Sequence, residues 1–229
     1  MIRAIIFDLD GTLADTEGLH FAAFSRVLEA EGIALGRDDY YSRLIGFDDR
    51  ECFAAVMSEH GRPPDDHELA SLIARKAAIY QKFIAERDVL YPGAAEFVRS
   101  CFGRFPLTIA TGTLRVEAEQ ILRRANLRDL FADIVAAEDV EHGKPAPDCM
   151  MAALARLSFI LRPHPPIEPG NCLVIEDTAA GIASARAAGM KVVAVCQTAG
   201  PEVLGAAHVV CESIGAIDLD AILRGFAGN

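Results

Sequence analysis

The sequence predicts an α/β protein, in which a doubly wound parallel sheet forms the core and an all-helical domain is inserted after the first strand. Short apolar runs recur along the chain, and each is followed by a turn and a stretch with helical periodicity. The segment from Asp15 to about Val89 interrupts this alternation, because it is helical in periodicity almost throughout. Polar turns rich in acids follow several apolar runs, where the strands of such a sheet would end.

The first apolar run, Ala4 to Phe7, predicts the first strand. Helical periodicity then follows at residues 19–30, 51–60 and 67–85, with no convincing strand between them. Asp15-Thr16 and the turn Leu90-Tyr91-Pro92-Gly93 would join this inserted piece to the rest. We therefore expect a core domain of residues 1–14 and 90–229, and a helical cap domain of residues 15–89.

Five further apolar runs predict the remaining strands, at residues 107–110, 134–136, 172–175, 192–195 and 208–210. Helices are expected around them at residues 93–101, 114–125, 147–157 and 179–188. Gly189 follows the last helix, where a glycine commonly terminates a helix. The ligand site of such a sheet lies at the carboxyl ends of its strands.

Composition restricts the function. The 229 residues carry 33 acidic and 22 basic side chains, a formal charge of −11 that disfavours nucleic acid and anionic membranes as partners. The six cysteines form no C-x-x-C pair, so neither zinc nor disulfides are indicated. No run approaches the ~18 apolar residues of a membrane span, and residues 1–7 leave no room for a signal peptide. A cytoplasmic protein is expected, and a monomer is compatible with the sequence.

The first strand is followed directly by Asp8-Leu9-Asp10-Gly11-Thr12. Strand alternation would place Asp8 and Asp10 on the same side, where one carboxylate could attack phosphorus while the other handles protons. Gly11 would let the backbone approach a phosphate, and Thr12 adds a hydroxyl. A bare D-x-D pair is as typical of a polar turn at the end of a strand, so the longer string carries the prediction.

Two more polar segments suit a phosphate. In Ile109-Ala110-Thr111-Gly112-Thr113, a hydroxyl and backbone N–H groups could bind phosphoryl oxygens, although Thr113 as the N-cap of a helix would explain the segment alone. In Gly143-Lys144-Pro145-Ala146-Pro147-Asp148, Lys144 could neutralise a phosphate and a carboxylate together. An isolated lysine there would ordinarily be a solvated surface charge.

Two adjacent acids, Glu176 and Asp177, follow the strand at residues 172–175 and begin a helix. Carboxylate oxygens are the ligands that Mg²⁺ prefers. Asp177 could instead simply cap the helix. Four such segments at strand ends favour a phosphate and metal site over four unrelated turns.

Read in order as DLDGT, TIATGT, GKPAPD and VIEDTAAGI, the segments resemble the four motifs of the haloacid dehalogenase superfamily, over essentially the whole chain. The resemblance implies a Rossmann-like core, Mg²⁺ as cofactor, Asp8 as a nucleophile that forms an aspartyl phosphate, and Asp10 as general acid and base. It also implies two sets of binding residues. The phosphate would be held by Gly11, Thr12, Thr111, Gly112 and Lys144. The metal would be held, directly or through water, by Asp8, the Asp10 carbonyl, Asp177 and Glu176.

The inserted segment, which begins Asp15-Thr16-Glu17-Gly18-Leu19-His20, resembles the helical cap of the subgroup containing β-phosphoglucomutase, phosphoglycolate phosphatase and sugar-phosphate phosphatases. In that subgroup the cap excludes water from the site and contacts the part of the substrate beyond the phosphate. Arg75-Lys76-Ala77-Ala78-Ile79-Tyr80 is similar to a segment of the mutase cap. The cap residues expected to contact substrate are Thr16, His20, Arg50 and Lys76.

The predicted function is a Mg²⁺-dependent phosphatase acting on a small phosphorylated metabolite, such as a sugar phosphate or a phosphoglycolate-like acid. A mutase that returns the phosphoryl group to a second hydroxyl is the alternative. The mutase has an arginine in a Gly-x-x-Arg turn, whereas this chain reads Gly46-Phe47-Asp48-Asp49-Arg50, with an aspartate at the expected position. Asp10 argues against a dehalogenase, which lacks that acid. The intact acids and Lys144 argue against a catalytically idle binding module.

Overall fold

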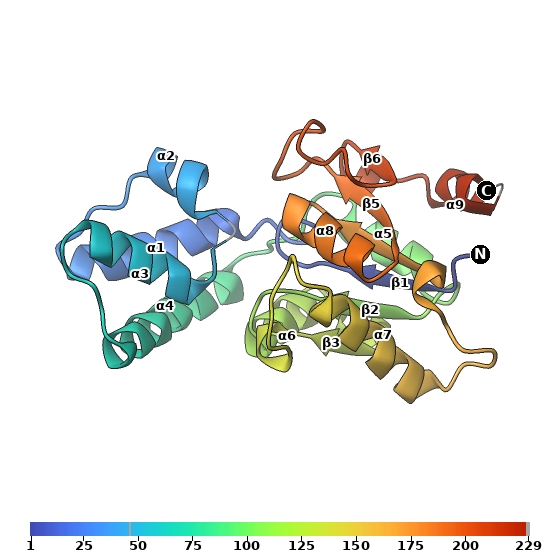
Figure 1. Ribbon diagram of the computed structural model, residues 1–229, viewed down its shortest axis with the longest axis horizontal. Coiled ribbons are helices and arrows are strands. Elements are labelled where there is room, and N and C mark those ends of the chain that lie inside the picture. The colour runs from blue at the N-terminus through green and yellow to red at the C-terminus, as the bar shows by residue number, and fades with distance from the viewer. Residues whose placement is uncertain (46, 228–229) are drawn as a thin grey trace. The chain divides into compact units, whose positions relative to one another are not determined.

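A computed structural model describes residues 1–45 and 47–227, and it divides the chain into two compact units (Figure 1). The larger unit comprises residues 1–15 and the described part of residues 88–229, and the smaller comprises the described part of residues 16–87. Gly46, which entered the comparison with the mutase turn, lies outside the described residues. None of the helices in the described ranges has the length and apolar character needed to cross a membrane.

The larger unit is built on a parallel sheet in the order β3-β2-β1-β4-β5-β6 (Figure 1). Its strands are β1 (Ala4–Phe7), β2 (Leu107–Ala110), β3 (Asp133–Val135), β4 (Cys172–Glu176), β5 (Lys191–Val195) and β6 (Val209–Cys211). The chain passes from β1 outward to β2 and β3, then returns to β4 on the other side of β1. This reversal confirms the predicted doubly wound fold and makes the carboxyl end of β1 the switch point.

Helices cover both faces of this sheet, because the strand side chains that point to either face are apolar. The helices are α5 (Ala94–Cys101), α6 (Arg115–Arg124), α7 (Asp148–Leu161), α8 (Ala179–Ala187) and α9 (Leu219–Ala227), with short 3₁₀ turns η2 (Arg128–Leu130), η3 (Ala137–Asp139), η4 (Pro169–Asn171) and η5 (Ile214–Ala216). On one face, Phe7 packs edge-on against Phe97 and Phe131. On the other, Ile6 and Val174 belong to a buried cluster with residues of α7 and α8.

The predicted ranges differ from the observed ones mainly at element ends. β1 and β2 have the predicted bounds, β3 and β6 are displaced by one residue, and β4 and β5 each gain one. α7 continues to Leu161 instead of ending at Leu157, because Leu157 is its last buried residue whereas the backbone stays helical until Arg162 adopts φ +47°. The apolar pattern therefore recorded the buried part of α7 and missed its exposed last turn.

Within its described residues, the smaller unit consists of helices and the loops that join them. It contains α1 (Glu17–Ala30), α2 (Arg37–Asp39), the π-helical turn η1 (Tyr40–Leu44), α3 (Asp49–Glu59) and α4 (Asp66–Glu86). α3 and α4 begin one or two residues earlier than predicted, since Asp48 and Asp65 accept backbone N–H bonds from Glu51 and Glu68 as N-caps. Sequence periodicity placed no element at α2 and η1.

The two chain segments that lead to and from the smaller unit are bonded to each other within the larger unit. Asp15 N–H donates to the Val89 carbonyl at 2.7 Å, and Ala14 pairs with Leu90 in an antiparallel bridge. Tyr91 N–H donates to the Leu13 carbonyl at 3.0 Å. The insertion therefore leaves and re-enters the core at adjacent points, just beyond β1.

Candidate active site

The chain turns sharply after β1 and presents two carboxyl groups. Asp8 N–H donates to the Ile175 carbonyl of β4, which fixes the start of the turn, and Asp8 itself is only 5% exposed. Gly11 has φ +82°, and a Cβ at this position would overlap the carboxylate of Asp177 and the methyl group of Thr198. Glycine is thus required here for conformation and for the close approach of Asp177.

Lys144, from the loop before α7, lies between two acids from different strands. Its ammonium donates to Asp8 Oδ1 and to Glu176 Oε1, both at 2.6 Å, and its side chain is 13% exposed. Burial alone would lower the pKa of Lys144, but the adjacent Asp8 and Glu176 carboxylates outweigh it and raise the pKa. Lys144 is therefore a fixed positive charge, and the surface-lysine alternative does not describe it.

Glu176 is held at both of its carboxylate oxygens. Oε1 accepts from Lys144, and Oε2 accepts from Asp177 N–H, Thr178 N–H and the Thr178 hydroxyl at 2.8 to 2.9 Å. A Cβ at Gly181 would overlap this carboxylate, so the first turn of α8 forms a cradle around it. Glu176 is locked in an orientation that points it at Lys144.

Asp177 is gripped by hydroxyls on both oxygens. Thr12 Oγ1 donates to Oδ1 at 2.7 Å, and Thr198 Oγ1 donates to Oδ2. Asp177 does not cap α8, because the N-cap is Thr178, whose hydroxyl accepts Gly181 N–H at 3.0 Å. Burial, followed by the charge of Glu176, raises the pKa of Asp177 to about 7.

Asp10 faces the turn after β2. Thr111 Oγ1 lies 3.5 Å from Asp10 Oδ2, and the Thr113 hydroxyl donates to the same oxygen. Thr113 therefore binds Asp10 instead of capping α6, whose N-cap is Leu114. Gly112, between the two threonines, is exposed, whereas both threonines are buried. The structure thus brings the predicted Thr111 to Asp10 and adds Thr113.

The balance of charge at this site fits a divalent cation. Three buried carboxyl groups, on Asp8, Glu176 and Asp177, lie around one lysine. Burial, and then Glu176 and Asp177, raise the pKa of Asp8 despite the opposing Lys144. Within the described residues, no three His, Cys, Asp or Glu side chains converge as ligands of one ion. Hard oxygens and uncompensated negative charge nevertheless suit Mg²⁺, which takes only one or two protein carboxylates in many sites.

A second buried lysine lies in the smaller unit. Lys76 is 1% exposed, and its ammonium lies 2.8 Å from His20 Nδ1 and 2.8 Å from Asp49 Oδ1. The rings of Phe24 and Tyr80 flank it at 4.9 and 5.0 Å. Burial, and then the charge of Lys76, lower the pKa of His20. Because the Lys76 ammonium can only donate, Nδ1 of His20 accepts this hydrogen bond.

The other predicted cap residues are placed differently. Arg50 is exposed and pairs with Asp66 at 2.7 Å, so it does not join Lys76. Thr16 is buried directly before α1, and its carbonyl accepts His20 N–H at 3.0 Å. Asp49 completes the cluster of Lys76 and His20 by pairing with the lysine. The sequence had indicated Asp49 only as an acid in the position where the mutase has an arginine.

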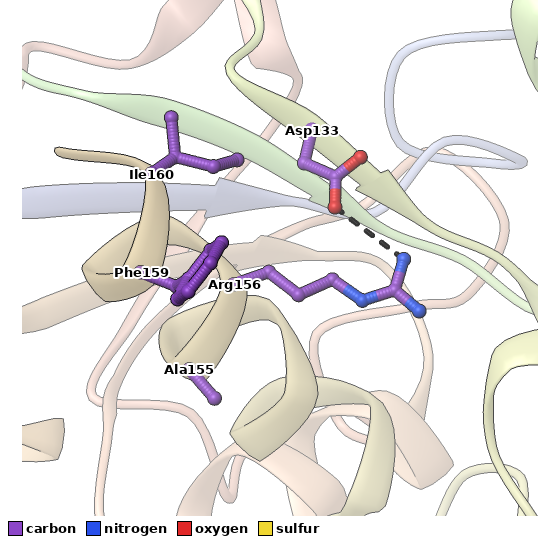
Figure 2. A pocket seen from close by; sticks show the side chains of 5 residues that line it. All are labelled: Asp133, Ala155, Arg156, Phe159 and Ile160. Atoms are coloured by element: carbon purple, nitrogen blue, oxygen red, sulfur yellow. Dashed lines mark hydrogen bonds and ion pairs between the residues drawn. The ribbon is translucent and has the colours of Figure 1, made fainter.

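The surface hollow drawn in Figure 2 is not part of this site. It has a volume of about 340 Å³ and is lined by Asp133, Ala155, Arg156, Phe159 and Ile160. Arg156 points toward Asp133 at 3.4 Å, and it also pairs with Asp139 at 2.8 Å. Asp133 begins β3, so the hollow lies toward the amino edge of the sheet, away from the strand ends that carry Asp8 and Asp177.

Asp8, the candidate nucleophile, is paired with Lys144 at the switch point of a doubly wound sheet. This arrangement is typical of an α/β enzyme whose active-site acids lie at the carboxyl ends of the strands. The model of the haloacid dehalogenase-like hydrolases matches residues 2–189, and the chain belongs to that family. This confirms the family indicated by the four motifs.

Two relatives and one solved structure are similar to this chain over most of its length. Protein CbbY of Rhodobacter capsulatus is 36% identical over 199 residues, which cover 84% of each chain. Fructose-1-phosphate phosphatase YqaB of Escherichia coli is 33% identical over 196 residues, covering 83% of this chain and 95% of the relative. The crystal structure of β-phosphoglucomutase from Clostridium difficile has a TM-score of 0.86 at 24% identity, covers 100% of this chain and 98% of its own, and shows the same fold.

Proposed function

We propose that this chain is a Mg²⁺-dependent phosphatase that hydrolyses a small phosphorylated sugar or similar metabolite through an aspartyl phosphate on Asp8. The observation that carries the proposal is the buried Lys144 ammonium, 2.6 Å from both Asp8 and Glu176. A cation in that position favours the ionised, nucleophilic form of Asp8 against the effect of burial, and it can stabilise the charge that develops on a transferring phosphoryl group.

In the first step, a carboxylate oxygen of Asp8 forms a bond to phosphorus while the ester P–O bond breaks. Asp10 donates a proton to the departing oxygen, which leaves as an alcohol. The Thr111 and Thr113 hydroxyls lie at Asp10 Oδ2 and would orient this carboxyl group. In the second step, Asp10 takes a proton from water, the water oxygen attacks phosphorus, and the bond to Asp8 breaks to release inorganic phosphate.

The remaining core residues hold the phosphate and the cation. Asp8, the Asp10 carbonyl and Asp177 would bind Mg²⁺, which neutralises phosphoryl oxygens when bound. Glu176, which accepts four hydrogen bonds, would fix Lys144 in place and would reach the cation directly or through water. The phosphate oxygens would be bound by Gly11, Thr12, Thr111, Gly112 and Lys144.

We further propose that His20 and Lys76 contact the part of the substrate beyond the phosphate. Asp49 compensates the charge of Lys76, and His20 is neutral, so this cluster has no net positive charge. Such a cluster suits the hydroxyls of a sugar better than a second phosphate group, which favours hydrolysis of a monophosphate over a mutase cycle through a bisphosphate. The name of the Escherichia coli relative, a fructose-1-phosphate phosphatase, supports a sugar phosphate.

The test is a panel of sugar phosphates and phosphorylated acids incubated with Mg²⁺, with free phosphate as the readout and Asp8→Asn as the control for contaminating phosphatase. We expect release of phosphate that Asp8→Asn abolishes. In a parallel reaction, β-glucose 1-phosphate with a trace of its 1,6-bisphosphate would be followed for glucose 6-phosphate and free phosphate together. Rapid formation of glucose 6-phosphate with little free phosphate would favour the mutase, and no turnover of any compound would favour an idle binding module.

A further inference from the structure

Two residues that follow β5, Gln197 and Thr198, reach back to the loop after Asp10 and to Asp177. Both lie beyond residues 2–189, the segment that the family model matches. They belong to none of the four motifs, and no step described above uses their side chains. Their contacts nevertheless converge on Asp177 and on the loop that carries its partner Thr12.

Gln197 fixes the loop that carries Thr12. Its side-chain Nε2 donates to the Gly11 and Thr12 carbonyls, both at 2.8 Å, and its Oε1 accepts Ile214 N–H at 2.8 Å. Gly11 and Thr12 are buried, so these carbonyls need protein donors. One amide side chain thereby bonds the turn after Asp10 to the 3₁₀ turn η5.

Thr198 contacts Asp177 directly, on the side opposite to Thr12. Its hydroxyl bonds Asp177 Oδ2 and lies 3.2 Å from the Asp177 carbonyl, while Thr12 donates to Oδ1 at 2.7 Å. The absence of a Cβ at Gly11 makes room for the Thr198 methyl group. Thr12 and Thr198 therefore hold the Asp177 carboxylate from two sides, and Gln197 holds the backbone of Thr12.

We propose that Gln197 and Thr198 are positioning residues, which orient Asp177 for the divalent cation. The proposal rests on the proposed function, in which Asp177 is a metal ligand. Partners that orient a ligand contribute to metal affinity because they restrict the carboxylate before the ion arrives. A purely structural role would instead stabilise the fold and leave the affinity for the ion unchanged.

The test measures Mg²⁺ binding directly, by isothermal titration calorimetry, together with kcat and KM for an aryl phosphate. Thr198→Val keeps the shape of the side chain and removes the hydroxyl, and Gln197→Ala removes both loop contacts. We expect each to raise the Mg²⁺ Kd by about tenfold or more, and Thr198→Ser to restore it to within about threefold of the unaltered protein. KM for the aryl phosphate, measured at saturating Mg²⁺, should change less than the Mg²⁺ Kd.

Thr108→Val is the matched control. Thr108 is also buried, and its hydroxyl donates to the Asp133 carbonyl at 3.0 Å, between β2 and β3. This variant should lose stability without a change in Mg²⁺ affinity. If Gln197→Ala does not fold, the comparison of valine and serine at position 198 decides alone.

Unchanged Mg²⁺ affinity in Thr198→Val, in a protein whose unaltered form hydrolyses phosphate esters with Mg²⁺, would overturn the positioning role and leave the proposed function intact. If the unaltered protein binds no Mg²⁺, the proposed function and this inference both fail.

Discussion

Replacing Lys144 by methionine tests the electrostatic core of the site. The change removes the ammonium that lies 2.6 Å from Asp8 and from Glu176, and it keeps a chain of similar length. At an effective dielectric constant of about 20, each contact represents a gross attraction of about 6 kcal/mol, most of which is offset by the cost of burying the charges. Removing one partner of a buried ion pair typically costs about 3–5 kcal/mol.

Lys144→Met should lower both turnover and the free energy of unfolding, and the two losses can be measured separately. Turnover of an aryl phosphate should fall by about 10²-fold or more, as it does when a donor to a developing anion is lost. The free energy of unfolding in urea, measured without Mg²⁺, should fall by about 3 kcal/mol, because Asp8, Glu176 and Asp177 then share a buried site with no cation. Added Mg²⁺ should recover part of this stability by binding the acids, without restoring turnover.

Lys191→Met is the matched control for this variant. Lys191 begins β5, is half-buried, and lies 5.7 Å from the centre of the Phe226 ring, away from the acids. It should change turnover by no more than about twofold. A loss of only a few-fold in Lys144→Met, or a loss no larger than that of Lys191→Met, would refute the role given to Lys144.

The other predictions concern the two aspartates after β1 and the histidine of the smaller unit. Asp8→Asn should abolish both turnover and acid-stable labelling by a phosphate ester, whereas Asp10→Asn should slow turnover and leave the fold intact, as judged by circular dichroism. Burial and Lys76 lower the pKa of His20 in the folded chain. As the pH falls below about 6.5, the unfolded chain therefore protonates this histidine before the folded chain does. The free energy of unfolding then falls by up to about 1.4 kcal/mol per pH unit. His20→Gln should flatten this slope in urea unfolding.

The fold was predictable because its signals are local. Each buried strand is a short apolar run that ends in a polar turn, so β1 and β2 were located to the residue. The acids of the site were predictable for a related reason: they stand next to the strands that carry them, within continuous strings such as Asp8 to Thr12. Strand order then brings strings far apart in sequence to one edge of the sheet.

The residues that sequence reasoning missed are those whose role depends on a distant partner. Gln197 and Thr198 bond Gly11, Thr12 and Asp177 across the sheet, and no spacing along the chain relates them. Thr113 was visible in the TGT string, but local chemistry suggested a helix cap, and only tertiary structure directs its hydroxyl to Asp10.

Under the proposed function, a chain with a net charge of −11 binds both a cation and a sugar phosphate, and the two buried lysines have different parts in this. Around Lys144, the carboxyl groups of Asp8, Glu176 and Asp177 outnumber the lysine, and the excess negative charge favours a divalent ion. Around Lys76, one carboxylate faces the lysine beside a neutral His20, so the charges cancel. The first cluster therefore suits an ion that in turn attracts a phosphate, and the second suits neutral hydroxyls. Under the proposed function, exchanging Asp49 for a basic residue would alter only the charge around Lys76, and would shift substrate preference toward compounds with a second anionic group.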